Sequence, residues 1–397
     1  MDYLSLICTN EISKEERIIK IINKLTIGFL LITLLYNGSS LIVGPFLVYS
    51  EPLGTTNTSS FTFTNNGNQI LNLTEIGQIS GVYVGVYVVG EYAYLMTLGG
   101  MKIFDISDPT NPIKMGSYYD GVGLGHSIKI NQNIAYIADH PEGLEIVNVS
   151  DPLNPVEIAD FYDGSGEGIG VFVLNELAFL ADRNDGLEII DVSDPTHPIE
   201  LGQYYNGNNA FNVYVANEIA FVGGPAGLEI IDISNTSSPS LLSEFTNRGE
   251  VDAVEIKDDF AYVTTWENGL IILNISEPTQ PLEVAQLYDG GGAMEIQIIG
   301  DVAFITDFQD GLELINISDP LNPVEIGQFN DGGEALGLHV IGNLAYIADQ
   351  VQGFEIIQIW EKEETESKKT SGFNFLHVFT GLLIIFGLFQ RFETRRN

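Results

Sequence analysis

A unit of about 42 residues occurs seven times in this chain, and this repetition restricts the possible folds more than any other feature. An alanine followed by tyrosine or phenylalanine recurs at intervals of 41 to 43 residues, from Ala93-Tyr94 to Ala345-Tyr346. A glycine of a Gly-Leu-x-Ile-like motif keeps the same spacing, at Gly100, Gly143, Gly186, Gly227, Gly269, Gly311 and Gly353. Because one such unit cannot bury a hydrophobic face alone, neighbouring units must stack on one another.

Short β-rich runs in the third unit indicate what one repeat forms. They occupy residues 171–174, 177–180, 187–192 and 199–205, and turn-forming residues stand between them. The unit is therefore a four-stranded antiparallel meander, which is the size of one propeller blade. The recurrent glycine predicts a residue with positive φ in the second hairpin. Seven units predict an all-β, seven-bladed β-propeller over residues 71–360.

The last unit lacks a fourth strand of its own, because the chain leaves it through residues 357–360. A matching strand stands ahead of the first unit, where Thr-Glu-Ile-Gly-Gln at 74–78 resembles Val-Glu-Ile-Gly-Gln at 324–328. We expect this N-terminal strand to complete the last blade, because closure of the ring removes exposed sheet edges.

The motif Leu-Glu-Ile-Ile-Asp-Val-Ser-Asp-Pro at 187–195, with its relatives at 144–152 and 312–320, resembles the LVIVD repeat. The resemblance covers about residues 73–360. That family is found on bacterial and archaeal surface proteins and is taken to form β-propellers. The resemblance therefore implies a cell-surface β-propeller, and it carries over no catalytic motif.

The chain is strongly acidic, with 54 Asp and Glu against 16 Lys and Arg and a formal charge of −38. Nucleic-acid binding needs clusters of Lys and Arg, so a nucleic-acid partner is excluded. The single cysteine, Cys8, excludes an intrachain disulfide and a cysteine-based zinc site.

The N-terminal part of the chain predicts an attachment to the membrane or an export signal. Residues 1–24 carry basic side chains and are expected to stay in the cytoplasm, and residues 25–49 are uncharged. The uncharged segment is either a transmembrane anchor or a signal peptide, and both alternatives export the rest of the chain. Residues 50–70, rich in Ser, Thr and Asn, form a linker that contains Asn57, the best candidate for glycosylation.

The C-terminal part predicts a second attachment. Residues 361–371 form a charged stalk, residues 372–389 are an uncharged transmembrane helix, and residues 390–397 form a basic cytoplasmic tail. Ser-Gly-Phe at 371–373, followed by an apolar helix and arginines, also resembles an archaeal C-terminal sorting signal cut by archaeosortases. The expected location is the cell membrane, with the propeller outside the cytoplasm.

Acidic residues should gather on the face where fourth strands lead to first strands and second strands lead to third strands. The candidate ligand-binding rim is Glu167, Glu250, Glu334, Asp139, Asp182, Asp307 and Asp349. Carboxylates are hard oxygen ligands, so Ca²⁺ is a possible occupant, although no calcium loop motif occurs and no cofactor is otherwise indicated. The alternative is that the repeated Asp residues accept hydrogen bonds from their own turns.

Histidines are few, and His126 and His140 of the second unit could approach one another beside Asp139. Two histidines and a carboxylate can hold a metal, but the spacing fits no metal motif, so the interpretation as ordinary surface histidines is preferred.

Export, anchoring and an enzyme-poor repeat together predict a cell-surface module that binds a glycan or protein partner and is not an enzyme. The alternative is an extracellular polysaccharide hydrolase or lyase that uses carboxylates of the rim, in particular Glu167, Glu250 or Glu334.

Overall fold

The computed structural model describes residues 33–36, 39–42, 71–119, 124–162, 164, 167–246, 248–288, 290–330 and 332–361. The chain divides into two compact units, Met1–Ser60 and Phe61–Asn397. Several predicted features lie outside the described residues, namely the segments 1–24 and 50–70 with Asn57, the stalk beyond Glu361, the helix 372–389 and the tail 390–397.

The first unit contains one described hairpin. Strands β1 (Thr33–Tyr36) and β2 (Ser39–Ile42) pair antiparallel within the predicted anchor or signal segment 25–49. The rest of that segment lies outside the described residues. In the part of the chain that is described, no helix is long and apolar enough to cross a membrane.

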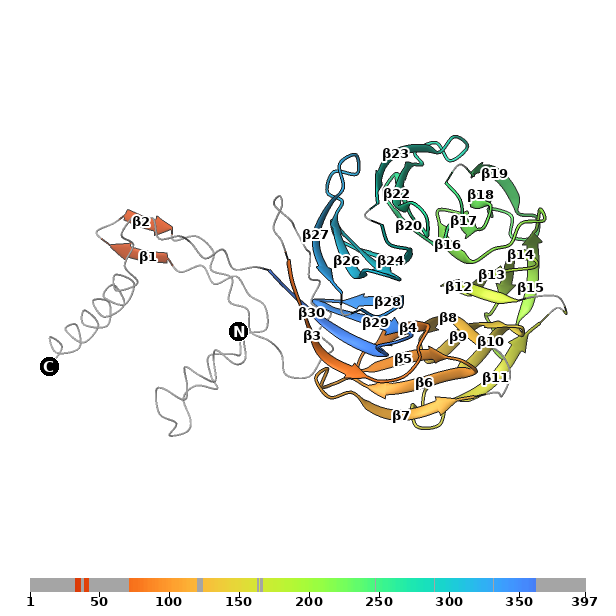
Figure 1. Cartoon of the computed structure of the whole chain (residues 1–397), viewed down its shortest axis with the longest axis horizontal. Coiled ribbons are helices and arrows are strands. Elements are labelled where there is room, and N and C mark those ends of the chain that lie inside the picture. The colour runs from red at the N-terminus through yellow and green to blue at the C-terminus, as the bar shows by residue number, and fades with distance from the viewer. Residues whose placement is uncertain are drawn as a thin grey trace. The chain divides into compact units, whose positions relative to one another are not determined.

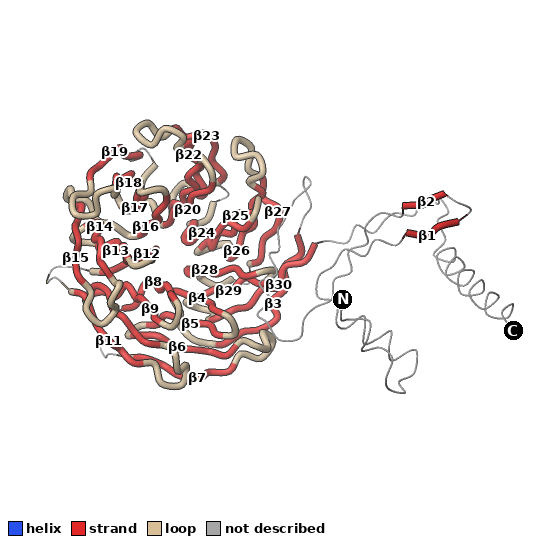
Figure 2. Tube along the Cα trace, turned by 180° about the vertical axis from the view of Figure 1, so that it is seen from behind, coloured by secondary structure: helices blue, strands red, loops and turns tan. Residues whose placement is uncertain are grey.

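The second unit is an all-β propeller of seven four-stranded antiparallel sheets around a central axis (Figures 1 and 2). The inner strands, nearest the axis, are β4 (Gly85–Val89), β8 (Leu124–Asn131), β12 (Gly168–Leu174), β16 (Asn212–Ala216), β20 (Ala253–Lys257), β24 (Ala293–Ile299) and β28 (Ala335–Ile341). The second strands are β5 (Tyr92–Thr97), β9 (Ile134–His140), β13 (Leu177–Asp182), β17 (Ile219–Gly224), β21 (Phe260–Thr265), β25 (Val302–Asp307) and β29 (Leu344–Asp349).

The outer half of each blade completes the sheet. The third strands are β6 (Gly100–Asp105), β10 (Gly143–Asn148), β14 (Gly186–Asp191), β18 (Gly227–Asp232), β22 (Gly269–Asn274), β26 (Gly311–Asn316) and β30 (Phe354–Glu361). The fourth strands are β7 (Ile113–Tyr118), β11 (Val156–Phe161), β15 (Ile199–Tyr204), β19 (Ser240–Phe245), β23 (Leu282–Leu287), β27 (Val324–Phe329) and β3 (Leu71–Ile79).

The ring closes as the sequence predicts. Strand β3, from the front of the domain, pairs antiparallel with β30 at its end, with Gln78 opposite Glu355. The seventh sheet is therefore assembled from both ends of the domain, in the order β28-β29-β30-β3. This pairing covers the edge of β30, which would otherwise be open to another chain.

The recurring Ala-Tyr/Phe motif is explained by the packing between blades. Seven hydrophobic clusters each join two neighbouring blades. Ala178 packs in the cluster shared with the preceding blade, and Phe179 packs in the cluster shared with the following blade. Both are buried, and their opposite directions follow from the two-residue alternation of a strand. A small residue on one side and a ring on the other let neighbouring blades fit together.

The recurring glycine has the predicted backbone conformation. Gly186 has φ of 78°, and the other six glycines of the motif also have positive φ. A Cβ on Gly186 would lie 2.5 Å from the carbonyl oxygen of Tyr204. Both the turn and the close approach of the fourth strand therefore require glycine at this position.

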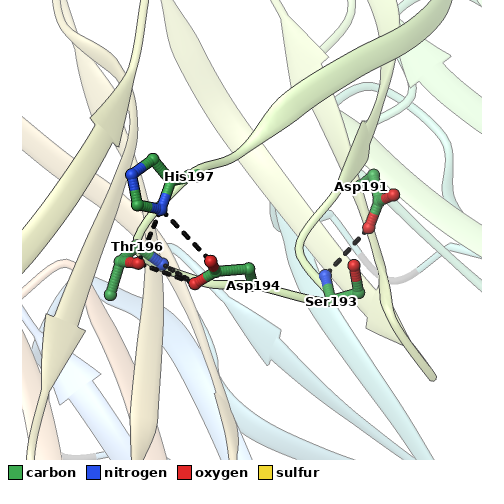
Figure 3. A network of polar contacts seen from close by, with 5 residues as sticks. All are labelled: Asp191, Ser193, Asp194, Thr196 and His197. Atoms are coloured by element: carbon green, nitrogen blue, oxygen red, sulfur yellow. Dashed lines mark hydrogen bonds and ion pairs between the residues drawn. The ribbon is translucent and has the colours of Figure 1, made fainter.

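Many of the repeated acidic residues accept hydrogen bonds within the turns between third and fourth strands. In the third blade (Figure 3) the Asp191 carboxylate accepts the Ser193 N–H at 2.9 Å, and Asp194 accepts the Thr196 N–H and hydroxyl at 3.1 and 2.6 Å. His197 Nδ1 lies 3.1 Å from Asp194. The hydrogen bonds from Ser193 and Thr196 lower the pKa of the two Asp side chains. These acids maintain a turn, and they recur because the turn recurs.

Candidate functional site

A cavity of about 220 Å³ lies on the axis of the ring and is lined by inner strands of all seven blades. One residue of each inner strand lies opposite the motif aromatic of its second strand, as Phe172 lies opposite Phe179. These residues, which we call the channel ring, are Tyr87, Lys129, Phe172, Tyr214, Glu255, Gln297 and His339. All seven line the cavity, so the blades present different chemistry at a position where the backbone repeats.

Three side chains of the channel ring bind the backbone of the next blade. The Glu255 carboxylate accepts the Ile298 N–H at 2.7 Å. Gln297 accepts the Val340 N–H at 2.6 Å and donates to the Val340 carbonyl at 3.1 Å. These bonds connect the fifth blade to the sixth and the sixth to the seventh.

The third of these side chains connects the seventh blade to the first, because His339 Nδ1 accepts the Val88 N–H at 2.9 Å. Burial, with a smaller contribution from Lys129, lowers the pKa of His339 to about 3, so its ring is neutral. The ring stacks on Tyr87 with centroids 4.4 Å apart, and the Lys129 ammonium lies 5.4 Å from the centre of the same Tyr87 ring. The aromatic rings and the ammonium group therefore form one wall of the channel.

The layer next to the channel ring contains one charged side chain. Two residues before each ring residue stand Gly85, Ser127, Gly170, Asn212, Ala253, Glu295 and Gly337. Six of these are small or uncharged, and the seventh is Glu295. Burial raises the pKa of Glu295, and Lys129 opposes that shift. Burial, together with the charge of Glu295, raises the pKa of Glu255 to about 8.

The channel opens through a second cavity of about 280 Å³, which we call the mouth. Ser127, Asn212 and Glu295 line both cavities, so the mouth leads to the channel. His126 and Asp252 also line the mouth. Burial lowers the pKa of His126 to about 4 and raises the pKa of Asp252 to about 7, the latter with a further contribution from Glu250. The mouth is therefore lined by two side chains, His126 and Asp252, whose pKa values are shifted from their ordinary values.

The three predicted Glu residues lie where first strands begin, on the same face as the mouth. Glu167 binds two neighbours, with its carboxylate 3.1 Å from His140 Nε2 and 3.4 Å from Arg183 Nη1. Glu250 is exposed and Glu334 is half-buried. Within the described ranges, no hydrogen bond or ion pair joins these three carboxylates to one another, so the structure does not bring them together as a pair.

The four predicted Asp residues lie beneath this face, with at most 1% of Asp139, Asp182, Asp307 and Asp349 exposed. The Asp307 carboxylate accepts the N–H groups of Gln309 and Asp310, both at 2.9 Å. Asp182 and Asp349 accept from the corresponding N–H groups of their own turns. The placement of Asp182, Asp307 and Asp349 agrees with the alternative in which the repeated Asp residues hold turns, and all four Asp side chains are buried.

The predicted histidine pair also has a defined place. The rings of His126 and His140 lie 6.4 Å apart. Across the described residues, no group of three or more His, Cys, Asp or Glu side chains is arranged to hold a metal ion.

Exposed tyrosines form a feature that the sequence motifs did not predict. We call the side that carries the connections from fourth to first and from second to third strands the mouth face. Tyr119, Tyr162, Tyr205 and Tyr288 follow the fourth strands of four blades on this face and are 49 to 69% exposed. The rings of three of them lie against a hairpin glycine, since a Cβ on Gly186 would lie 3.3 Å from Tyr205 Cδ2.

Tyr162 instead borders a surface cavity of about 390 Å³ with acidic walls. The other lining residues are Pro141, Glu142, Glu145, Glu157 and Asp160. The Tyr118 hydroxyl donates to Glu157 at 2.9 Å and so fixes one carboxylate of this wall.

Both the channel ring and the exposed tyrosines occupy regular positions in the sequence. The channel ring stands seven residues before each motif aromatic, as Lys129 stands before Tyr136, and its residue type changes from unit to unit. Each of the four exposed tyrosines directly precedes Asp-Gly or Asn-Gly, as Tyr205 does. In a repeat protein, positions whose residue type differs between otherwise similar units are candidates for a functional role.

The fold and channel define a seven-bladed β-propeller repeat protein, a class that acts through interaction surfaces. The LVIVD repeat model matches the chain seven times, at residues 80–120, 123–163, 165–206, 207–247, 248–289, 290–331 and 332–371, so the chain belongs to the LVIVD repeat family. Among solved structures, the computationally designed Ika8 protein is similar in fold, with a TM-score of 0.54 and 9% identity over 75% of this chain and 100% of that chain. No curated protein matches the chain.

Proposed function

We propose that the protein is a membrane-anchored, extracytoplasmic propeller that binds a cell-surface glycan on its mouth face. The row of exposed tyrosines on the first three blades, Tyr119, Tyr162 and Tyr205, carries the proposal. The C–H face of a sugar ring is apolar and packs well on an aromatic ring. The rings of Tyr119 and Tyr205 lie against hairpin glycines, so they lose little freedom on binding.

The acidic cavity beside Tyr162 supplies the polar half of such a site. Sugar hydroxyls donate hydrogen bonds, and the walls of this cavity consist mainly of acceptors such as Glu157 and Asp160. The Tyr118 hydroxyl holds Glu157 in place before any ligand arrives, which lowers the cost of binding. A stacking ring next to fixed acceptors supports a glycan over an apolar or acidic partner.

The location is proposed from the ends of the chain. Residues 25–49 and 372–389 are uncharged and have basic residues on their outer sides. Basic flanks remain in the cytoplasm, so the propeller between them would lie on the other side of the membrane.

A glycan array probed with the detergent-solubilised full chain tests this function. We expect binding to oligosaccharides, weakened roughly three- to tenfold by Tyr162→Ala or Tyr205→Ala, because one aromatic contact contributes about 0.5–1.5 kcal/mol. The matched control is Leu153→Ala, an exposed apolar residue in a turn between third and fourth strands on the opposite face. Binding to basic peptides in place of glycans, or equal loss in the control, would contradict the proposal.

A polysaccharide hydrolase or lyase is the second candidate, and the pair Asp252 and Glu250 favours it. Burial raises the pKa of Asp252 to about 7, so this side chain can donate a proton at neutral pH beside an exposed Glu250. Release of reducing ends from an array-selected polysaccharide, abolished by Asp252→Asn, would support an enzyme. Binding without any product would exclude it for that substrate.

A further inference from the structure

A basic side chain, Lys129, and an acidic side chain, Glu295, line the axial cavity without forming an ion pair. The Lys129 ammonium and the Glu295 carboxylate both border the 220 Å³ space. Burial raises the pKa of Glu295, and the positive charge of Lys129 opposes that rise. No hydrogen bond or ion pair within the described part of the chain engages either side-chain head group, apart from the contact of Lys129 with the Tyr87 ring.

The other polar members of the channel ring are already used by the framework. Glu255, Gln297 and His339 each bind the backbone of the next blade, so their geometry is explained by the stability of the ring. No such bond explains Lys129 or Glu295 among the described residues. An ionisable side chain withdrawn from water without a partner is unfavourable, so Lys129 and Glu295 at one cavity point to a missing occupant that carries both a negative and a positive group.

Aromatic side chains form part of the wall between Lys129 and Glu295, beside the polar Asn212 and Glu255. Phe172 and Tyr214 lie in contact with ring centroids 5.0 Å apart, and Tyr87 lies on the other side of Lys129 in the channel ring. The cavity is smaller than the roughly 300–1,000 Å³ of sites for drug-sized ligands, so its occupant is compact. The mouth gives a ligand a route to it, since Glu295 borders both spaces.

We propose that the axial channel binds a small amino carboxylate, whose carboxylate pairs with Lys129 and whose ammonium group pairs with Glu295. The short carbon chain of the ligand packs against the rings of Phe172 and Tyr214. A dipolar ligand satisfies both charges at once, whereas a simple amine or a simple carboxylate leaves one of them unpaired. This site is separate from the tyrosines of the mouth face and does not depend on the proposed glycan function.

Isothermal titration calorimetry of the detergent-solubilised full chain tests the inference with a graded panel. The dipolar probes are glycine, β-alanine, γ-aminobutyrate and 5-aminovalerate, and the monopolar probes are butylamine and butyrate. We expect at least one dipolar probe to bind at least roughly tenfold more tightly than either monopolar probe, since each lost ion pair of about 1.4 kcal/mol is a factor of ten. Equal binding of butylamine, or no binding by any dipolar probe, would overturn the inference.

Matched variants locate the site. Lys129→Met and Glu295→Gln should each weaken the selected probe by roughly tenfold or more, whereas Lys114→Met and Glu244→Gln, both exposed, should not. The double reversal Lys129→Glu with Glu295→Lys should restore part of the affinity, because the ligand can bind in the opposite direction. A thermal melt of each variant confirms that it folds, and ligand should raise the apparent Tm of the wild type but not of the single variants. Unchanged affinity in folded Lys129→Met or Glu295→Gln would place the ligand elsewhere and overturn the inference.

Discussion

At the scale of the residue, equivalent positions of the channel ring carry different side chains, and three of them bind the backbone of the next blade in different ways. Gln297 binds both backbone groups of Val340, and Glu255 and His339 each accept one N–H from the next blade. Glutamine does not titrate, whereas glutamate and histidine do, and a histidine ring nitrogen accepts a hydrogen bond only when it carries no proton. The bonds of the channel ring at Glu255 and His339 should therefore make the free energy of unfolding depend on pH.

His339 should weaken the fold in acid. Its pKa falls from 6.5 to about 3 on folding, so between these values the unfolded chain binds the extra proton. The free energy of unfolding then decreases as pH falls below 6.5, by up to about 1.4 kcal/mol per unit. His339→Gln introduces the residue that the sixth blade has at this position, Gln297. The variant should lose less thermal stability between about pH 6.5 and 4 than the wild type. An unchanged pH profile in a folded variant would contradict this role.

Glu255 should act in the opposite direction. Its pKa rises from 4.5 to about 8, so the folded chain holds the proton that the unfolded chain releases. The free energy of unfolding therefore falls as pH rises from about 4.5 through 8. Glu255→Gln should raise the apparent Tm at about pH 8 relative to the wild type and have less effect at about pH 5. Greater destabilisation by Gln in the alkaline sample than in the acidic one would show that the carboxylate is ionised in the fold.

At the scale of the element, the strand order and the tight hairpins follow from the sequence because they are repeated. The recurring glycine predicts positive φ, and the Ala-Tyr/Phe pair marks the second strand. Gly186 and Gly207 offer a matched pair, since both have positive φ but only Gly186 lies against another strand.

Gly186→Ala should destabilise the protein more than Gly207→Ala. An alanine at either position has a strained backbone, at a cost of about 1–3 kcal/mol. At Gly186 the new Cβ also meets the Tyr204 carbonyl, 2.5 Å away, whereas nothing lies within 4 Å at Gly207. Thermal melts of both variants should therefore show the larger drop in Tm for Gly186→Ala. Equal effects would mean that the close packing of the fourth strand adds nothing.

The candidate site was predictable only in part, for a physical reason. The alternation of a strand and the residues of a turn depend on neighbouring residues in the sequence. The strands and turns of a blade can therefore be predicted from short motifs. The channel brings together residues far apart in the sequence, such as Tyr87 and His339, and no local rule couples them. The acids chosen from the sequence were mostly those that repeat, and repetition marks a role in the turn, as at Asp307. Lys129 and Glu295 each occur in one blade and carry no motif.

At the scale of the whole propeller, the closed ring makes a rigid platform whose two faces differ in chemistry. One face carries the turns between third and fourth strands, where acids such as Asp194 are occupied by their own loop. The mouth face carries the exposed tyrosines and the opening of the channel. Seven packed interfaces between blades keep these features in fixed relative positions, which favours binding over conformational switching.

The proposed membrane topology predicts which thiols an impermeant reagent can reach. Cys8 is the only cysteine and would lie in the cytoplasm, whereas the exposed Leu153 would lie outside. In intact cells, a membrane-impermeant maleimide should label Leu153→Cys and leave the wild-type chain unlabelled. Detergent permeabilisation should expose Cys8 if the N-terminal segment is retained. Labelling of Cys8 without labelling of Leu153→Cys in intact cells would reverse the topology.

Hydrogen–deuterium exchange of the full chain, with and without the oligosaccharide selected on the array, tests the central claim most directly. If the mouth face is the binding surface, the ligand should slow exchange in the loops around Tyr119, Tyr162 and Tyr205. The turn at residues 193–198 on the opposite face should exchange at an unchanged rate. Slower exchange confined to residues 193–198 and its equivalents, or no change on the mouth face, would contradict the account.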